Sequence, residues 1–198
     1  MVTPAVQVGM SLDDFIRLYD KEGPFEIING ERIPLMPNVV GHNEIVKIIV
    51  FALHSFFSNN PLGDVAFETP FVLSYVSSWV TGSLVPDVMY YSTERLAAYK
   101  DANPDWKKKP YILIPDLAVE VVSPNDDLGE LDEKVNLYLT DGVRLVWVIN
   151  PNKVNVSIYT LISLQPFTKQ QTTLKVGDTL TGGEIIPGFD IPVAILFE

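Results

Sequence analysis

The amino-acid sequence predicts an α/β fold in which helices cover a mixed β-sheet. The main observation is the stretch Tyr111–Pro151, where an apolar run, a loop, a helical pattern and a second apolar run follow one another. This order is typical of a crossover unit whose two strands are parallel. A parallel sheet is usually covered on both faces, which explains why Leu117–Val122 and Leu145–Ile149 are apolar nearly throughout.

The N-terminal part predicts a helix followed by a β-hairpin. Ser11 can cap the helix, and Gly23 ends it. The segments Phe25–Ile28 and Glu31–Leu35 then flank Asn29-Gly30, a dipeptide that strongly favours a two-residue hairpin turn. We therefore expect an N-terminal hairpin.

The rest of the chain predicts further helices and short strands. The pattern at Gly41–Phe57 carries so many apolar residues that we expect this helix to be pressed against a sheet. Near the C-terminus, Gly-Gly and Pro-Gly turns separate short strands of an antiparallel addition. The predicted helices are Gly41–Phe57, Thr93–Lys100 and Gly129–Leu139, and the further strands are Val65–Leu73, Leu84–Tyr91, Asn155–Leu161, Thr172–Lys175 and Ile191–Phe197.

Length and composition predict a single domain over residues 1–198. The 198 residues include no obvious linker or shift in composition, and a chain of this length can bury a true core. No apolar run reaches the roughly 18 residues needed to span a bilayer, so we expect no membrane partner.

The cysteine count limits the kinds of metal site that the chain can form, and the net charge limits the partners that it can bind non-specifically. The chain has no cysteine, which excludes disulfides and thiolate metal sites and fits a cytoplasmic location. Acidic residues outnumber basic residues 25 to 14, which gives a formal net charge of −11. This charge opposes broad, non-specific affinity for a polyanion such as DNA.

Two strand carboxylates are the first candidates for chemistry. Glu120 lies inside the apolar run Leu117–Val122, where a carboxylate is costly to bury without a partner or a metal. Asp87 follows Val85-Pro86 in an earlier strand that could pair with the strand of Glu120. Two carboxylates that face one another can hold a hard divalent cation. The alternative is that each acid lies at a strand end or faces a loop, and Pro-Asp is indeed common in turns.

Three further residues have both a structural and a functional interpretation. Lys134 lies on the flank of the apolar stripe of its helix and could reach Glu120, or it could be a surface lysine paired with Glu130. His42 stands at the start of the helix Gly41–Phe57, where a histidine is more often structural but can also face a cleft. The simplest interpretation of Glu26, on the first arm of the hairpin, is an outward-facing acid.

Taken together, these segments resemble the Uma2 family, a domain of unknown function within the PD-(D/E)XK nuclease superfamily. The resemblance covers nearly the whole chain, and the ordered set of segments is more specific than any one of them. The segments are FEIINGE, VPDVMYYS, PDLAVEVVSP, DEKVNLY, GVRLVWVINP and IPGFDIPVAILF. The resemblance implies a restriction-endonuclease-like core in the order αβββαβ, formed by Gly41–Phe57, Val65–Leu73, Leu84–Tyr91, Leu113–Val122, Gly129–Leu139 and Leu145–Ile149.

The resemblance also implies an active site. Asp87 matches the aspartate of the first half-motif and Glu120 the acid of the second, and together they would bind Mg²⁺ or Mn²⁺. The standard lysine, two residues after the acid, is replaced by Val122. Families of this type often place the lysine on the following helix, and Lys134 fits that position.

Two more residues match positions of the family. Glu26 matches the acid of its N-terminal hairpin motif, which implies a secondary metal ligand or a base. His42 matches the histidine that often starts the first core helix.

The function implied is that of a metal-dependent endonuclease that hydrolyses phosphodiester bonds, most simply in DNA. The main alternative is a catalytically inactive module of the same fold that binds nucleic acid or protein, which Val122 and the net charge favour. A third option is a hydrolase of a small phosphate ester. The sequence leaves the oligomeric state open, with a homodimer as one option.

Overall fold

The computed structural model describes residues 9–73, 78–124 and 126–198. Their contacts divide the chain into two compact units, which we describe separately. The first unit consists of Met1–Pro37, Thr69–Val85 and Asn103–Ile114, and the second of Asn38–Glu68, Pro86–Ala102 and Pro115–Glu198. A single domain over residues 1–198 stays a prediction.

The first unit is built around the predicted hairpin. Asn29 and Gly30 both have positive φ angles, 53° and 82°, as a type I′ hairpin turn requires. The hairpin continues into a four-stranded sheet in the order β3-β2-β7-β5. The elements are β1 (Met10–Ser11), α1 (Leu12–Glu22), β2 (Phe25–Ile28), β3 (Glu31–Pro34), β5 (Phe71–Leu73), β6 (Trp79–Val80), β7 (Gly82–Leu84) and the 3-10 helix η1 (Trp106–Lys108).

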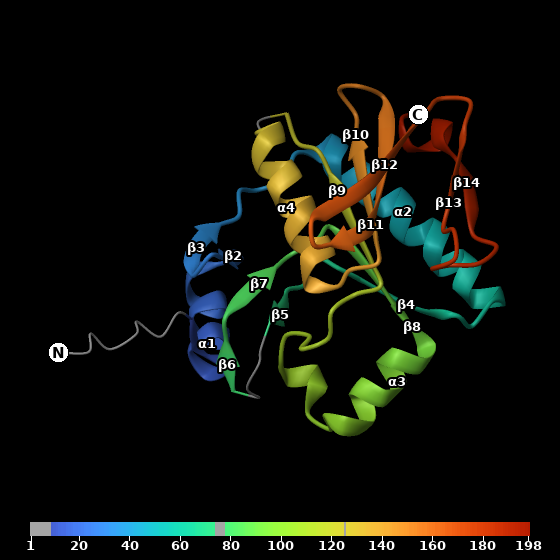
Figure 1. Cartoon of the computed structure of the whole chain (residues 1–198). Helices are drawn as coiled ribbons and strands as arrows, with labels where there is room; N and C mark the ends of the chain where they lie inside the picture. Colours follow the sequence, from blue (N-terminus) through green and yellow to red (C-terminus); the bar gives the residue numbers. More distant parts are fainter. Residues whose placement is uncertain (1–8, 74–77, 125) are drawn as a thin grey trace. The chain divides into compact units, whose positions relative to one another are not determined.

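The second unit contains a six-stranded mixed sheet in the order β12-β11-β10-β9-β8-β4. The pair β9–β10 is parallel, and helix α4 (Leu128–Asp141) connects these two strands, so the predicted crossover unit is confirmed (Figure 1). All other pairs of adjacent strands in this sheet are antiparallel. The strands are β4 (Gly63–Phe67), β8 (Val88–Ser92), β9 (Leu117–Val121), β10 (Leu145–Asn150), β11 (Asn155–Leu164) and β12 (Phe167–Lys175).

Helices cover both faces of this sheet. Ile49 of α2 shares a core cluster with Val119 and Val121 of β9. Because side chains alternate along a strand, Glu120 points to the opposite face, which α4 covers. The remaining elements of the second unit are α2 (Val40–Asn59), α3 (Thr93–Ala102), α4 (Leu128–Asp141), β13 (Thr179–Thr181), β14 (Asp190–Pro192) and the 3-10 helix η2 (Val193–Leu196).

Prolines break two of the predicted strands. The segment predicted as Val65–Leu73 forms β4 and β5, which belong to different sheets, with Pro70 between them. The segment Leu84–Tyr91 is likewise divided into β7 and β8, with Pro86 between them. Proline has no N–H for a sheet ladder and restricts the residue before it, so each proline ends a strand. The division at Pro86 leaves Asp87 just before β8.

Three other boundaries differ from the predictions. The predicted strand Leu113–Val122 is shorter, at Leu117–Val121. The strands β11 and β12 are longer than expected and form one extended hairpin. The predicted strand Ile191–Phe197 is β14 followed by η2.

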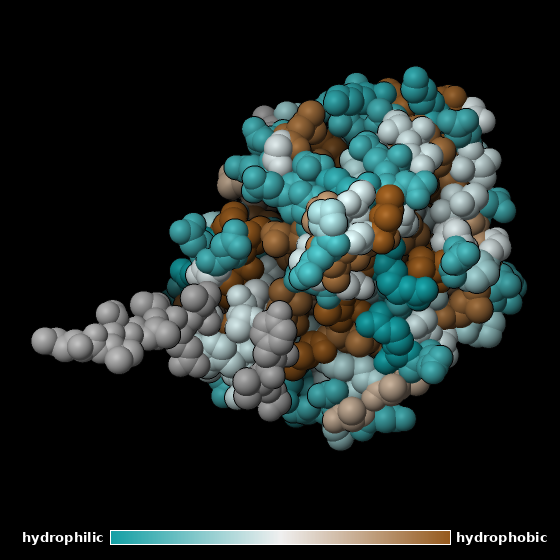
Figure 2. All heavy atoms as spheres, in the orientation of Figure 1, coloured by the Kyte–Doolittle hydropathy of each residue, from teal (hydrophilic) through white to brown (hydrophobic). Residues whose placement is uncertain are grey.

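Hydrophobic side chains reach the surface in several patches between hydrophilic ones (Figure 2). Among the exposed hydrophobic residues is Phe51 of α2, which is 65% exposed. With 20 residues and a mean hydropathy of 1.2, α2 is long and apolar enough to cross a membrane by length and composition alone. It also contacts β4, β8 and β9 and buries Ile49 and Leu53 completely, as the core helix of a globular unit does. The absence of a membrane partner therefore stays a prediction.

Candidate active site

Asp87 lies where the chain enters β8. Its carboxylate is partly buried, with 14% of the side chain exposed. Oδ2 accepts a hydrogen bond from the Val121 N–H at 2.6 Å and lies 3.1 Å from His42 Nε2. Both bonds fall on Oδ2, which fixes the orientation of the carboxylate and leaves Oδ1 without a recorded partner among the described residues.

Glu120 is buried on β9 and receives its partners from α4. Lys134 Nζ lies 3.1 Å from Oε1 and 3.2 Å from Oε2, and the Tyr138 hydroxyl donates to Oε1. Lys134 and Tyr138 are four residues apart, so they lie on the same side of the helix. A carboxylate in an apolar strand needs such partners because burying it unpaired is costly.

The two carboxylates come together through the pairing of β8 with β9. The antiparallel register pairs Val88 with Val119. Continuing this register by one residue places Asp87 opposite Glu120. The Val121 N–H that binds Asp87 belongs to the peptide group that follows Glu120. The structure therefore places both acids and the Lys134 ammonium in one small region of the second unit.

His42 is the first buried residue of α2 and bonds to Asp87. Its Nδ1 lies 3.3 Å from Asn43 Oδ1, and its Nε2 contacts the Asp87 carboxylate. Burial alone would lower the pKa of His42, but the hydrogen bond with Asp87 and its charge outweigh burial and raise this pKa. His42 is thus arranged to hold Asp87 in place.

Glu26 belongs to the first unit, on β2. The expectation that it faces outward is wrong, because the residue is only 4% exposed. Its Oε1 accepts a hydrogen bond from the Val85 N–H at 2.8 Å, which links β2 to the end of the β7 segment. A role for Glu26 as metal ligand or base stays a prediction.

Val122 occupies the position where the standard motif has lysine. Its side chain is buried, and its N–H donates to the Ile149 carbonyl at 2.8 Å. Val122 therefore continues the pairing of β9 with β10 and brings no charge to the site. The ammonium group beside Glu120 comes from α4 instead.

The donor set fits a hard divalent ion with few protein ligands. Asp87 and Glu120 supply carboxylate oxygens, which Mg²⁺ and Mn²⁺ prefer. Within residues 9–73, 78–124 and 126–198, no group of three or more His, Cys, Asp or Glu side chains is placed to hold a metal. Mg²⁺ usually keeps several waters and needs only one or two carboxylates, so two acids are sufficient.

Sequence reasoning did not identify Tyr138 as part of this site. Tyr138 lies on the apolar stripe of its helix and is fully buried. Its position four residues after Lys134 was a usable signal, because both side chains face the same way. The hydroxyl then needs a partner when the ring is buried, and Glu120 is that partner.

A further buried acid, Asp116, was not singled out from the sequence. It is fully buried, its Oδ2 accepts from the Ser92 N–H at 2.9 Å, and Arg95 lies 2.7 Å from its Oδ1. Arg144 lies 3.6 Å from the same oxygen. These contacts join α3 and the start of β9 and β10, which gives Asp116 a structural role.

Comparisons with known proteins agree with this fold. The crystal structure of "a putative nuclease belonging to DUF820" from Anabaena variabilis matches with a TM-score of 0.74 and 18% sequence identity, over 95% of this chain and 97% of that chain. At this identity the likeness shows the fold, and it confirms the predicted mixed sheet flanked by helices.

The sequence comparisons identify the family. No curated protein matches the sequence. The family model Uma2, described as "Putative restriction endonuclease", matches residues 12–194. This match covers nearly the whole chain and confirms the resemblance on which the site was predicted, so the chain belongs to the Uma2 family.

Proposed function

We propose that this protein is a metal-dependent endonuclease that hydrolyses phosphodiester bonds in DNA. Membership in the Uma2 family supports a nuclease-like function. The observation that carries the finer proposal is the position of Lys134 Nζ, 3.1 Å from Glu120 and in the same region as Asp87. Two acids and a lysine are the groups that a nuclease of this superfamily needs, although here the lysine comes from a helix.

Asp87 and Glu120 would hold Mg²⁺ or Mn²⁺ through their carboxylate oxygens. When bound here, a divalent ion would lower the pKa of a coordinated water and would stabilise negative charge on the phosphate. His42 and the Val121 N–H keep the Asp87 carboxylate in one orientation, and Tyr138 does the same for Glu120. Such fixed positions matter because ligands that are already in place do not have to reorganise during the reaction.

Lys134 would act on the reacting groups themselves. Its ammonium can donate hydrogen bonds to the attacking water or to a phosphate oxygen while it remains paired with Glu120. The side chain is 15% exposed, so one part of it remains accessible to a substrate. Charge that develops on the phosphate would therefore meet a fixed cation.

The catalytically inactive module remains the alternative, because Val122 leaves the standard lysine position apolar and the chain carries a formal charge of −11. Under this alternative the fold would bind nucleic acid or protein without cleavage. The Lys134–Glu120 pair would then only neutralise a buried acid.

A cleavage assay separates the two functions. Plasmid DNA, labelled DNA oligonucleotides and labelled RNA would be incubated with wild-type protein in Mg²⁺, in Mn²⁺ and in chelator. We expect metal-dependent cleavage that is lost in Glu120→Gln and kept in Glu44→Gln, a change of an exposed glutamate on α2. Failure of the wild type to cleave any of these substrates with either ion would favour the inactive module.

A further inference from the structure

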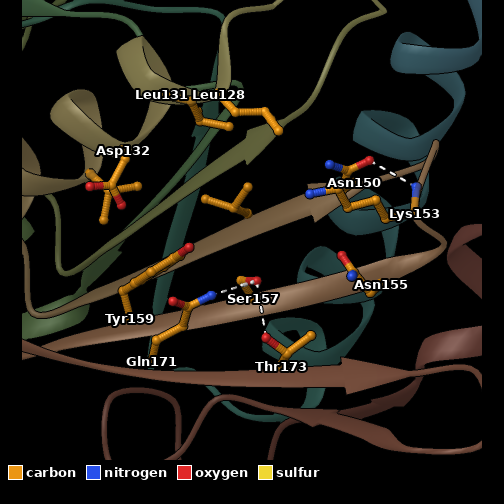
Figure 3. Close-up of a pocket in the computed structure, with 12 residues that line it drawn as sticks. Leu128, Leu131, Asp132, Asn150, Lys153, Asn155, Ser157, Tyr159, Gln171 and Thr173 are labelled. Carbon is orange, nitrogen blue, oxygen red and sulfur yellow. Dashed lines mark hydrogen bonds between the residues drawn. The ribbon is translucent and has the colours of Figure 1, made fainter.

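A cavity of about 270 Å³ lies in the second unit between α4 and the strands β10, β11 and β12. Leu128, Leu131 and Val135 of α4 form an apolar wall. On the strand side, Asn155, Ser157 and Gln171 offer amide and hydroxyl groups (Figure 3). The cavity therefore combines an apolar surface with several hydrogen-bonding groups.

The register of the sheet places this cavity beside Glu120. Val148 lines the cavity and is the direct neighbour of Glu120 on the adjacent strand. Ser157 is the neighbour of Val148, and Thr173 is the neighbour of Ser157. Residues in register point to the same face of a sheet, so this row leads from Glu120 across the cavity floor. Two strand spacings separate Glu120 from Ser157, about 10 Å.

The polar groups of the cavity keep hydrogen-bonding capacity for a ligand. Gln171 Nε2 donates to Ser157 Oγ at 3.3 Å, and Ser157 Oγ lies 3.4 Å from Thr173 Oγ1 (Figure 3). Among the described residues, the side-chain oxygen Oε1 of Gln171 and the side-chain amide of Asn155 form no hydrogen bond with another residue. An amide offers both donors and acceptors, which is what the edge of a nucleobase requires.

The lining of the cavity includes one ammonium group, from Lys153, and one carboxylate, from Asp132. Lys153, from the turn between β10 and β11, contributes to its lining. The Asp132 carboxylate pairs with Lys169 of β12, whose Nζ lies 2.5 Å from Asp132 Oδ1 and 2.7 Å from Asn136 Oδ1, so among the described residues Lys153 carries the unneutralised charge of the lining. A phosphate next to the cavity would thus meet a local ammonium group despite the net charge of −11.

We propose that this cavity binds one unpaired nucleobase of the substrate, adjacent to the phosphodiester bond at Asp87 and Glu120. The proposal rests on the proposed function, because it takes that site as the place of cleavage. The volume lies just below the ~300–1,000 Å³ typical of small-molecule pockets, which suits one ring system and excludes a base pair. A base has apolar faces for Leu131 and Val148 and polar edges for Gln171 and Asn155. The substrate class is therefore single-stranded nucleic acid, or a duplex with one nucleotide turned out.

A binding experiment tests the cavity without relying on cleavage. Side-chain amide signals would be followed by NMR in chelator while deoxyadenosine monophosphate or deoxycytidine monophosphate is added, with deoxyribose 5-phosphate as the base-free comparison. We expect saturable shifts of the Asn155 and Gln171 signals with the nucleotides and none with the sugar phosphate. Gln171→Leu should raise the nucleotide Kd about 3- to 10-fold, the range of one lost hydrogen bond.

Gln170→Leu is the matched control, because Gln170 is the neighbouring residue on the same strand and points to the other face. An unchanged Kd in Gln171→Leu, an equal loss in both variants, or equal shifts with the sugar phosphate would overturn the proposal.

A second measurement keeps failure of the cavity distinct from failure of the proposed function. The kcat/KM for a single-stranded oligonucleotide in Mn²⁺ should fall in Gln171→Leu and not in Gln170→Leu. Cleavage that is equal in wild type and Gln171→Leu refutes the base site and leaves the nuclease intact. Nucleotide binding at the cavity without cleavage of any substrate supports the base site and refutes the nuclease.

Discussion

Replacing Lys134 with alanine removes the cation from the centre of the candidate site. Lys134 Nζ lies 3.1 Å from Glu120 Oε1, and the two side chains are only 15% and 10% exposed. Breaking a fully buried ion pair costs about 3–5 kcal/mol, because the remaining charge is left uncompensated. Here the Tyr138 hydroxyl still donates to Glu120 and some solvent reaches it, so we expect a loss of about 1–3 kcal/mol in the free energy of unfolding.

The effect on turnover should be larger than the effect on folding. A group that stabilises charge developing in the transition state typically contributes ~10²–10³ in rate. We therefore expect Lys134→Ala to reduce metal-dependent cleavage by at least this factor under single-turnover conditions, with little change in substrate Kd. Lys134→Arg should not restore the rate fully, because a planar guanidinium replaces a compact ammonium poorly.

Metal-induced stabilisation is a second measurement on Lys134→Ala, and unlike the cleavage rate it should not fall. Without the lysine, the two carboxylates of the empty site repel each other with less compensation, and a divalent ion relieves this repulsion. The rise in Tm with Mn²⁺ should therefore be at least as large in Lys134→Ala as in wild type. Lys47→Ala, a change of an exposed lysine on α2, is the control. If Lys134→Ala cleaves as fast as wild type, the assignment of the catalytic lysine to α4 is wrong.

Three further substitutions test other parts of the structure. Asp87→Asn should abolish the Mn²⁺-induced rise in Tm, whereas Asp13→Asn, at an exposed position on α1, should leave it unchanged; equal shifts would place the ion elsewhere. Tyr138→Phe should lower the free energy of unfolding by about 1.5–3 kcal/mol in urea titrations, because a buried carboxylate loses a hydrogen bond. Burial raises the pKa of Asp141 from 3.8 to about 6. Since the folded-state pKa exceeds the unfolded one, this carboxylate lowers stability progressively between about pH 4 and pH 6 and by a constant amount above. Asp141→Asn should therefore stabilise the protein by about 1–3 kcal/mol at pH 7.5 and hardly at all at pH 4, and an equal gain at both pH values would contradict this reasoning.

The parts of the fold that were predictable depend on local patterns. Asn29-Gly30 specifies its turn through backbone angles that few other residues adopt, and the hairpin follows. The crossover from β9 through α4 to β10 could be read from two apolar runs and a helical stripe. The divisions at Pro70 and Pro86 were less predictable, because each proline interrupts a run of otherwise strand-forming residues. Whether the chain resumes in the same sheet depends on distant segments that pair with it.

The candidate site was predictable only in the residues whose sequence context is unusual. Glu120 stands out because the residues on either side of it are apolar, and Asp87 because of its family motif. Asp116 stands immediately before the same apolar run, yet Arg95 and Arg144 neutralise it, and these arginines lie on other segments of the chain.

Lys134 and Tyr138 show the same dependence on three-dimensional position. The sequence allowed Lys134 either to reach Glu120 or to face solvent, and only the packing of α4 against β9 places its ammonium beside the acid. The same packing places the hydroxyl of the buried Tyr138 ring where it donates a hydrogen bond to Glu120. In this candidate site, one helix positions both the cation beside Glu120 and the hydroxyl group that holds this acid in place. The positions of both groups therefore depend on the angle and register at which α4 packs on the sheet, and a motif within a single strand does not specify these.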